Sequence, residues 1–216
     1  LNSTHSFLSG VAKTELIRFI GHLDVYHIWI RMFRRAKIKL VHSQGFHPQP
    51  KIQLASALSL GYTGSHELLE CWLEEDISSE ELNQRLSVIR HPGIDIVGME
   101  EVPLNLPAMQ TRVQTQTYSI QLFNVDIEEL TTRLEQLSCQ PELWVDRKKK
   151  TVDVKPFWLG YHWLDITANN GIALELVFAA GELTNGKPDE ILRLLEVDPL
   201  NCLIERTQLT LSQTSG

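Results

Sequence analysis

The residue types best suited to chemistry gather in one basic stretch near the start of the chain. No Asp or Glu occurs from Val25 to His66, whereas this stretch holds six Lys and Arg residues and four histidines. The chain of 216 residues has a formal net charge of −7, so the stretch predicts a local positive field within a negative total. Such a field suits an anion-binding surface. The alternative is that the stretch pairs with segment 67–101, where ten carboxylates outnumber two arginines.

Two segments of this region could form one binding site. A helix predicted to begin at His22 would present free N–H groups to an anion, and the imidazole could add a hydrogen bond. In the loop 43–51, Gly45 allows a ligand to approach the backbone closely. Phe46 could stack on a nucleobase and Lys51 could contact a phosphate. Packing roles are equally open, because His22 could cap the helix and Phe46 could fill the core.

The candidate substrate- or anion-binding residues are Arg18, His22, Asp24, Arg31, Arg34, Arg35, Ser43, Gly45, Phe46, His47 and Lys51. Six of them are expected to converge on one concave surface, namely Arg18, His22, Arg31, Gly45, His47 and Lys51. Salt-sensitive anion binding is expected from the cations of this set, Arg31, Arg34, Arg35 and Lys51, because nucleic-acid phosphates release counterions when they are neutralised.

Other kinds of site find no motif in the sequence. The three cysteines lie 68 and 63 residues apart, without the close spacing of a zinc or iron–sulfur ligand set. His42 and His47 lack an obvious third ligand, and no phosphate-binding glycine loop or GxSxG nucleophile motif is present. We therefore predict no metal, no cofactor and no catalytic residue in this chain. The cysteines are expected to be unpaired and largely buried, as in a reduced cytoplasm: Cys71, Cys139 and Cys202.

Hydrophobic periodicity predicts the same order of elements twice, β-α-β-β-α-β. The first set comprises strand 14–20, helix 22–36, strands 52–58 and 68–74, helix 78–89 and a strand from Ile94. The second set comprises strand 118–122, a helix from Asp126, short strands 143–147 and 152–154, strand 172–178, helix 188–196 and strand 203–211. The run Arg147–Lys150 between the short strands is interpreted either as a solvated hairpin tip or as a phosphate contact.

This order predicts an α+β fold built from two tandem ferredoxin-like (βαββαβ) halves. Residues 1–10 are small and polar and are interpreted as a leader or linker. Residues 11–102 would form the first half with the basic loop–helix site, 103–114 a proline-containing linker, and 115–212 the second half. In the first half, helix 22–36 would show one polar stripe formed by Asp24, His27, Arg31 and Arg34.

Several motifs resemble the radical-SAM-linked domain of unknown function, a family found beside bacterial cobalamin-binding radical SAM proteins or fused to their C-terminus. The specific matches are Arg18-Phe19-Ile20-Gly21-His22-Leu23-Asp24, Arg31, Arg34-Arg35-Ala36, Ser43-Gln44-Gly45-Phe46-His47-Pro48-Gln49-Pro50-Lys51 and Leu58-Ser59-Leu60-Gly61. Weaker matches are segments 152–156 and 187–192, where Lys155 and Lys187 replace expected arginines. The resemblance covers nearly the whole chain.

The resemblance implies a companion of a radical SAM protein or of a fused radical SAM domain. The 4Fe–4S cluster, S-adenosylmethionine and cobalamin would then belong to the partner module. A chain that starts at Leu1 agrees with a fragment of such a fusion. Without an apolar run of about 18–20 residues or a signal peptide, the protein is expected in the cytoplasm.

Three functions remain open from the sequence. The first is a non-catalytic recognition module that presents a substrate, RNA, to the radical SAM enzyme. The second is a metal-independent RNA endonuclease in which His22 and His47 act as general acid and base. The third is a protein–protein docking domain whose acidic face, 67–101, forms the interface.

Overall fold

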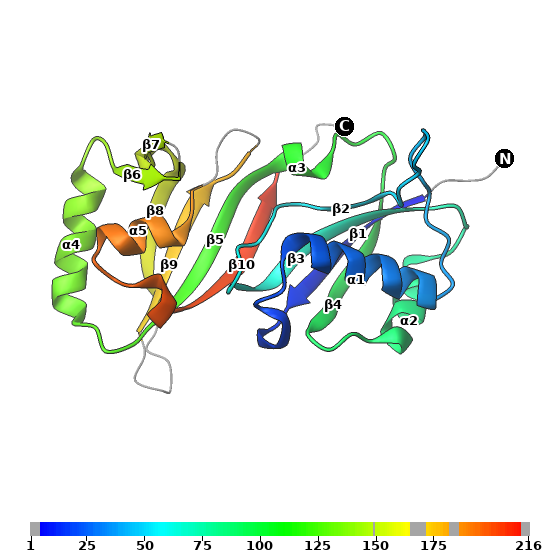
Figure 1. Ribbon diagram of the computed structural model, residues 1–216, viewed down its shortest axis with the longest axis horizontal. Coiled ribbons are helices and arrows are strands. Elements are labelled where there is room, and N and C mark those ends of the chain that lie inside the picture. The colour runs from blue at the N-terminus through cyan, green and yellow to red at the C-terminus, as the bar shows by residue number, and fades with distance from the viewer. Residues whose placement is uncertain (1–4, 149, 165–171, 182–185, 213–216) are drawn as a thin grey trace. The chain divides into compact units, whose positions relative to one another are not determined.

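The computed structural model describes residues 5–148, 150–164, 172–181 and 186–212. Helices and a largely antiparallel set of strands confirm the α+β class (Figure 1). The chain divides into two compact units. The first unit runs to Val113 and is joined by the chain end from Leu211, and the second unit spans Gln114–Thr210.

The first unit is built on a four-stranded antiparallel sheet. Its strands are β1 (His5–Lys13), β2 (Ile52–Leu54), β3 (Thr63–Leu73) and β4 (Ile94–Val102), in the order β4-β1-β3-β2. The helices α1 (His22–Arg35) and α2 (Ser79–Ile89) pack with this sheet around one hydrophobic core (Figure 1). A short 3-10 helix, η1 (Glu15–Ile17), connects β1 to α1.

Helix α1 forms where the sequence predicts it and exposes the expected polar stripe. Ile28, Trp29, Met32 and Phe33 are buried, whereas the four polar stripe residues are exposed. Acidic and basic residues occupy opposite ends of α1, which suits the helix dipole. The core therefore holds one face of α1 and leaves its arginines in solvent. Helix α2 begins as expected after Ser78, whose hydroxyl accepts a hydrogen bond from the Glu81 N–H at 3.2 Å.

The first strand corrects two predictions. Residues 5–10 belong to β1 and are not a leader, and residues 14–20 contain η1 where a strand was expected. Strand β1 lies between β3 and β4, so Ser6 and Ser9 are buried like Phe7 and Val11. The two hydroxyls donate to carbonyls of β4, at 2.8 Å to Val102 and 3.1 Å to Gly98. A central strand that is buried on both faces lacks the polar–apolar alternation that predicts a strand, so the sequence pattern does not indicate β1.

Other boundaries of the first unit shift. Strand β2 has three residues where seven were expected, and β3 begins five residues earlier than predicted. The expected linker 103–114 contains a one-turn helix, α3 (Met109–Arg112), with Met109 fully buried. The Gln110 side chain donates to the Leu54 carbonyl at 3.3 Å. The α3 part of the expected linker is therefore structured and packs on the first unit.

In the second unit, four strands pair side by side in the order β10-β5-β9-β8. Its elements are β5 (Val113–Leu122), α4 (Ile127–Cys139), β6 (Trp144–Arg147), β7 (Lys150–Asp153), η2 (Lys155–Phe157), β8 (Trp158–Leu164), β9 (Ile172–Ala179), α5 (Pro188–Leu194), η3 (Pro199–Asn201) and β10 (Leu203–Leu211). Asp126 caps α4 as predicted, because its carboxylate accepts from the Glu128 and Glu129 N–H groups.

The sequence did not predict β8. It assigned the strands between the two helices of the second half to other segments. The short strands predicted at 143–147 and 152–154 form a separate two-stranded hairpin, β6–β7, and β8 pairs with β9 instead. Strand β8 is an edge strand of alternating partial exposure, with a register shift at Gly160. Its aromatic and polar composition gives little apolar periodicity, which is why the pattern search overlooked it.

The three cysteines are unpaired, as predicted, but their burial differs. Cys71 and Cys202 are buried, whereas Cys139 at the end of α4 is exposed, so the prediction of burial is wrong for Cys139. Burial raises the pKa of the Cys71 thiol to about 12, with the Glu70 carboxylate adding to the shift. Among the described residues, no helix is long and apolar enough to cross a membrane.

Candidate anion-binding site

Most of the candidate residues fall into three separate places in the first unit, and Arg18 and Asp24 lie in none of them, so the expected convergence on one concave surface is wrong. The α1 arginines Arg31, Arg34 and Arg35 line one hollow. His22 lines a different pocket. The loop 43–51 projects into solvent, with every residue from Ser43 to Gln49 exposed. Each place has its own chemistry.

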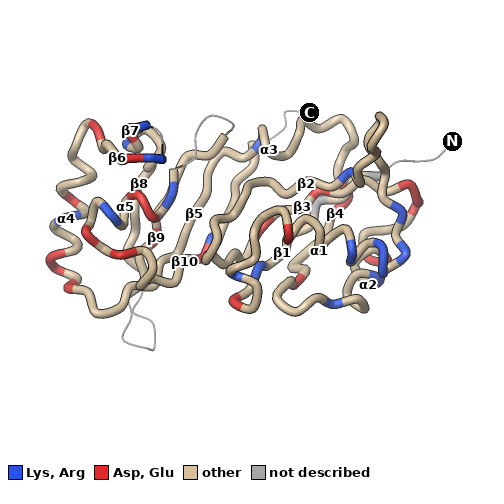
Figure 2. The backbone as a smooth tube through the Cα atoms, in the orientation of Figure 1, with Lys and Arg blue, Asp and Glu red and all other residues tan. Residues whose placement is uncertain are grey.

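The first place is a hollow between α1 and the end of α2, with a volume of about 340 Å³. We call it the arginine hollow. Its polar wall consists of Arg31, Arg34, Arg35, Arg90 and His91, and its apolar floor consists of Ile28, Met32 and Ile89. Figure 2 shows Lys and Arg positions gathered toward the C-terminal half of α1. The sequence predicted the three α1 arginines but not the two residues that follow α2.

The four guanidinium groups of the arginine hollow have no partner within the described chain. None of them forms a hydrogen bond or ion pair there, and no carboxylate lines the hollow. Arg85 on α2 behaves differently, because Glu75 and Glu81 bind its guanidinium. The acidic segment thus neutralises its own arginine and leaves the α1 arginines free. The alternative that the basic stretch pairs with segment 67–101 fails for these arginines.

Arg90 and His91 add two further signs of a binding site. The Nδ1 atom of His91 is buried without a hydrogen-bond partner among the described residues, and a buried unpartnered polar atom is costly. Arg90 has a φ of 21°, outside the regions that ordinary residues favour. Backbone strain of this kind clusters at functional sites. In the sequence, the predicted helix 78–89 ends just before these two residues, to which the pattern assigns no role.

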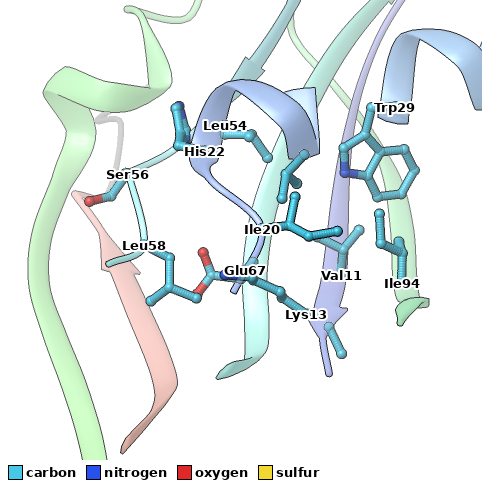
Figure 3. Close-up of a pocket in the computed structure, with 12 residues that line it drawn as sticks. Val11, Lys13, Ile20, His22, Trp29, Leu54, Ser56, Leu58, Glu67 and Ile94 are labelled. Carbon is cyan, nitrogen blue, oxygen red and sulfur yellow. The ribbon is translucent and has the colours of Figure 1, made fainter. Parts of the chain in front are cut away.

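The second place, the His22 pocket, is narrow and mostly apolar. Its cavity volume is about 30 Å³, enough for one or two water molecules. Figure 3 shows Lys13 and Glu67, from neighbouring strands, at one side of Ile20, with His22 and Ser56 toward the other end. Lys13 and Glu67 are both buried, and the Lys13 ammonium donates to the Arg18 carbonyl at 3.0 Å. A pocket of this size does not admit a nucleotide.

The third place, the loop 43–51, is held at its base and open at its tip. The Gln49 N–H donates to the Ser43 hydroxyl at 3.0 Å, and the Tyr26 hydroxyl on α1 donates to the Pro50 carbonyl at 3.1 Å. Gly45 has a φ of 135°, which only glycine adopts readily. Phe46 is fully exposed, so it does not fill the core. The ends of the loop are thus held by hydrogen bonds, while the aromatic ring of Phe46 is exposed.

The remaining candidates have partners of their own. Lys51 places its ammonium 4.3 Å from the centre of the Trp72 ring. Arg18 forms an ion pair with Glu15 at 2.9 Å and lies over the Phe19 ring. Asp24 is exposed in the first turn of α1 and does not line the arginine hollow. These three do not add to the hollow.

An acid–base pair of His22 and His47 finds no support in this arrangement. His22 lines the narrow pocket, whereas His47 lies exposed on the loop and does not line that pocket. Two groups that act on one phosphodiester must both reach it. Among the described residues, no group of three or more His, Cys, Asp or Glu side chains could hold a metal ion.

Comparison with solved structures gave low similarity. A Cbf5–Nop10–Gar1 complex aligns with 94% of this chain and 48% of its own at 10% identity and a TM-score of 0.49. An H/ACA ribonucleoprotein bound to a substrate RNA aligns with 86% and 43% at 9% identity and a TM-score of 0.43. A putative glycine cleavage system transcriptional repressor aligns with 98% and 99% at 10% identity, with a TM-score of 0.26. The chain thus spans less than half of the first two.

Neither fold nor function is carried over from structures with these TM-scores. Comparison with curated proteins gave no match. The comparison with protein families gave a match over residues 8–188, which include most of both units and the whole arginine hollow. The chain therefore belongs to a family described as uncharacterized proteins conserved in bacteria, DUF2344.

Proposed function

We propose that this protein is a non-catalytic RNA-binding module that holds RNA phosphates in the arginine hollow. The observation that carries the proposal is the set of four guanidinium groups around one hollow, for which the described residues supply neither a partner nor a carboxylate in the lining. Maintaining four like charges together is unfavourable unless an anion joins them. Arginine suits phosphate because its planar donors match two oxygens at once.

The apolar floor and His91 extend this chemistry. Ile28, Met32 and Ile89 lower the local dielectric beneath the guanidinium groups, which strengthens their attraction for a phosphate. His91 lines the same hollow, so its imidazole adds a polar side chain beside the guanidinium groups. Phe46 on the loop is free to stack on a base of the same RNA.

Part of the arginine set also serves the helix itself. Arg34 and Arg35 lie in the last turn of α1, where a cation complements the helix dipole by about 0.3–1 kcal/mol. Arg31 lies a turn earlier and gains little from the dipole, so this structural role does not account for it. We therefore assign Arg31 to the ligand.

We further propose that the RNA is presented to a radical SAM protein or a fused radical SAM domain. The support is the resemblance of segments 18–24, 43–51 and 58–61 to the radical-SAM-linked domain. The 4Fe–4S cluster, S-adenosylmethionine and cobalamin would be held by that partner. Cys71 is a poor cluster ligand here, because burial keeps its thiol protonated. Unpaired cysteines fit the cytoplasm as the place of action.

Both units support the proposal of tandem ferredoxin-like halves. In the first unit, the elements β1, α1, β2, β3, α2 and β4 follow the βαββαβ order, with the sheet order β4-β1-β3-β2. The second unit repeats both orders with β5, α4, β8, β9, α5 and β10, in the sheet order β10-β5-β9-β8. The hairpin β6–β7 is then an insertion between α4 and β8 of the second half.

A binding measurement with matched arginine variants tests the proposal. Single-stranded RNA is titrated at low salt into the wild type, Arg31→Gln/Arg34→Gln and Arg85→Gln. We expect the double variant to lose at least tenfold in affinity, since one charged hydrogen bond contributes about 1.5 kcal/mol. Arg85→Gln removes a charge that Glu75 and Glu81 already bind, so its affinity stays within about twofold.

Thermal melting of the same variants controls for folding. The stripe arginines are exposed and have no partner among the described residues, so the double variant should fold, with at most a small loss from the helix-dipole contribution of Arg34. Arg85→Gln removes only partly exposed ion pairs, so it should fold as well. Equal RNA affinity in the wild type and the folded double variant would reject the arginine hollow as the RNA site.

A further inference from the structure

The second unit contains a separate groove that the proposed function leaves unused. It has a volume of about 1070 Å³ and lies between the hairpin β6–β7 and helix α5. We call it the hairpin groove. Its basic and aromatic lining consists of Trp144, Arg147, Lys148, Lys150, Lys187 and Arg193. Figure 2 shows Lys and Arg positions on both strands of the hairpin.

The acidic residues that line this groove are already engaged. Glu190 is buried and receives two hydrogen bonds from the Arg147 guanidinium, at 2.6 and 2.9 Å. Asp189 lies 3.5 Å from the Arg193 guanidinium. Asp146 accepts a hydrogen bond from the Thr151 hydroxyl at 2.9 Å. The acids therefore neutralise only part of the positive charge, and the Arg147–Glu190 pair fixes the hairpin on α5.

The lysines of the groove are free. Lys148, Lys150 and Lys187 form no side-chain hydrogen bond or ion pair within the described chain. Three ammonium groups facing one groove favour a ligand with several negative charges. A phosphate backbone has that pattern.

Trp144 adds an aromatic surface beside these charges. Its side chain is 54% exposed, whereas Trp29, Trp72 and Trp158 are buried. The indole N–H donates to the Glu142 carboxylate at 2.9 Å, which orients the exposed ring. An exposed ring next to free cations is the combination that binds single-stranded nucleic acid, with bases on the ring and phosphates on the cations.

We propose that the hairpin groove binds a single-stranded RNA segment, with a base stacked on Trp144 and phosphates held by Lys148, Lys150 and Lys187. The choice of RNA as ligand rests on the proposed function, but the groove and its residues are independent of the arginine hollow. The run Arg147–Lys150 then has two roles. Arg147 fixes the hairpin, and its neighbouring lysines contact the ligand.

Tryptophan fluorescence tests the stacking contact in the full chain. A single-stranded oligouridine of eight nucleotides is titrated into the wild type, Trp144→Leu and Trp144→Phe. We expect RNA to quench the fluorescence of the wild type and not that of Trp144→Leu. The affinity should fall about 5- to 100-fold in Trp144→Leu, and less in Trp144→Phe, which keeps an aromatic face.

Charge variants test the phosphate contacts in the same titration. Lys148→Gln/Lys150→Gln should weaken binding and lower the magnitude of the salt slope by about 1.4, because each lost phosphate contact to a single strand contributes about 0.7. The control is Arg133→Gln on α4, whose guanidinium is already bound by Glu129 and Glu196. Its affinity should match that of the wild type.

The two proposals fail in different ways. If the Arg31/Arg34 variant loses RNA while the Trp144 and lysine variants do not, the groove proposal is overturned and the proposed function stands. If only the groove variants lose RNA, the groove is supported and the arginine hollow is rejected. If the wild type binds no RNA, both are overturned. A polyglutamate peptide that binds as tightly as RNA, without dependence on Trp144, would overturn the choice of ligand.

Discussion

The His22 pocket and the arginine hollow both carry charge in the first unit, but they hold it under opposite conditions. In the pocket, Lys13 and Glu67 are buried among apolar side chains. In the hollow, four arginines are exposed, and none has a partner in the part of the chain that the structure describes. Buried charges must be compensated within the fold, whereas exposed unpartnered charges are available to a ligand. The comparison assigns the pocket to stability and the hollow to binding.

The largest expected effect on stability comes from a substitution in the apolar wall of the His22 pocket. Trp29 is 1% exposed and lines the pocket. Trp29→Ala should lower the free energy of unfolding by about 3–5 kcal/mol, measured by urea denaturation. Where the variant still folds, its RNA affinity should be unchanged. A Trp29→Ala protein with wild-type stability would show that the pocket does not support the fold.

A smaller effect is expected from crowding the buried carboxylate. A Cβ added at Gly64 would lie 2.5 Å from Oε1 of Glu67, so that side chain must move within the pocket. Gly64→Ala should cost about 1–3 kcal/mol. Gly98→Ala is the matched control on β4, because its new Cβ meets nothing within 4 Å. Equal unfolding midpoints for the two variants would contradict the account of the pocket.

A third buried charge gives a pH test of the same division. Burial raises the pKa of Glu70, although Arg112 and Lys51 partly oppose the shift, and its Oε2 lacks a hydrogen-bond partner among the described residues. Folding favours the protonated form of a carboxyl whose folded-state pKa is raised. Its contribution to the free energy of unfolding is therefore lost as the pH rises from the unfolded pKa, about 4.3, through the folded pKa. We expect Glu70→Gln to flatten this decline in stability as the pH rises above about 4.3. An identical pH profile for the variant would show that Glu70 does not titrate differently on folding.

The smallest expected effect concerns thiol reactivity, because buried thiols are closed to a reagent and exposed thiols are open to it. Cys71 and Cys202 are buried, and burial raises their pKa values to about 12 and about 11. Cys139 is exposed. A thiol reagent at pH 8 should label Cys139 in the native protein and all three cysteines after denaturation, as read by mass spectrometry. Rapid labelling of Cys71 in the native state would mean that the core of the first unit opens easily.

The sequence predicted elements whose pattern is local. A clear apolar face and charges that suit the helix dipole predicted helix α1. Capping residues predicted the starts of α2 and α4. Strand β1 could not be found in this way, because residues on both of its faces are buried and the strands that pair with its two edges, β3 and β4, come from distant parts of the chain. Its small polar residues are explained only by the carbonyls of β4 that they contact.

The sequence predicted only the part of the arginine hollow that follows from a local pattern. The helical spacing of Arg31 and Arg34 places them on one stripe, which the sequence shows directly. Arg90 and His91 come from a segment of opposite overall charge, and only tertiary packing brings them to α1. His22 was misassigned because a helix N-terminus is a common anion site, whereas here its imidazole lines a narrow, mostly apolar pocket.

The salt dependence of RNA affinity tests the central claim most directly. The dissociation constant of single-stranded RNA is measured from low to moderate salt for the wild type and for Arg31→Gln/Arg34→Gln. If both arginines neutralise phosphates, the double variant should show a slope of log affinity against log salt that is smaller in magnitude by about 1.4. Parallel lines for the two proteins, with equal affinity at every salt concentration, would contradict the assignment of the arginine hollow to RNA binding.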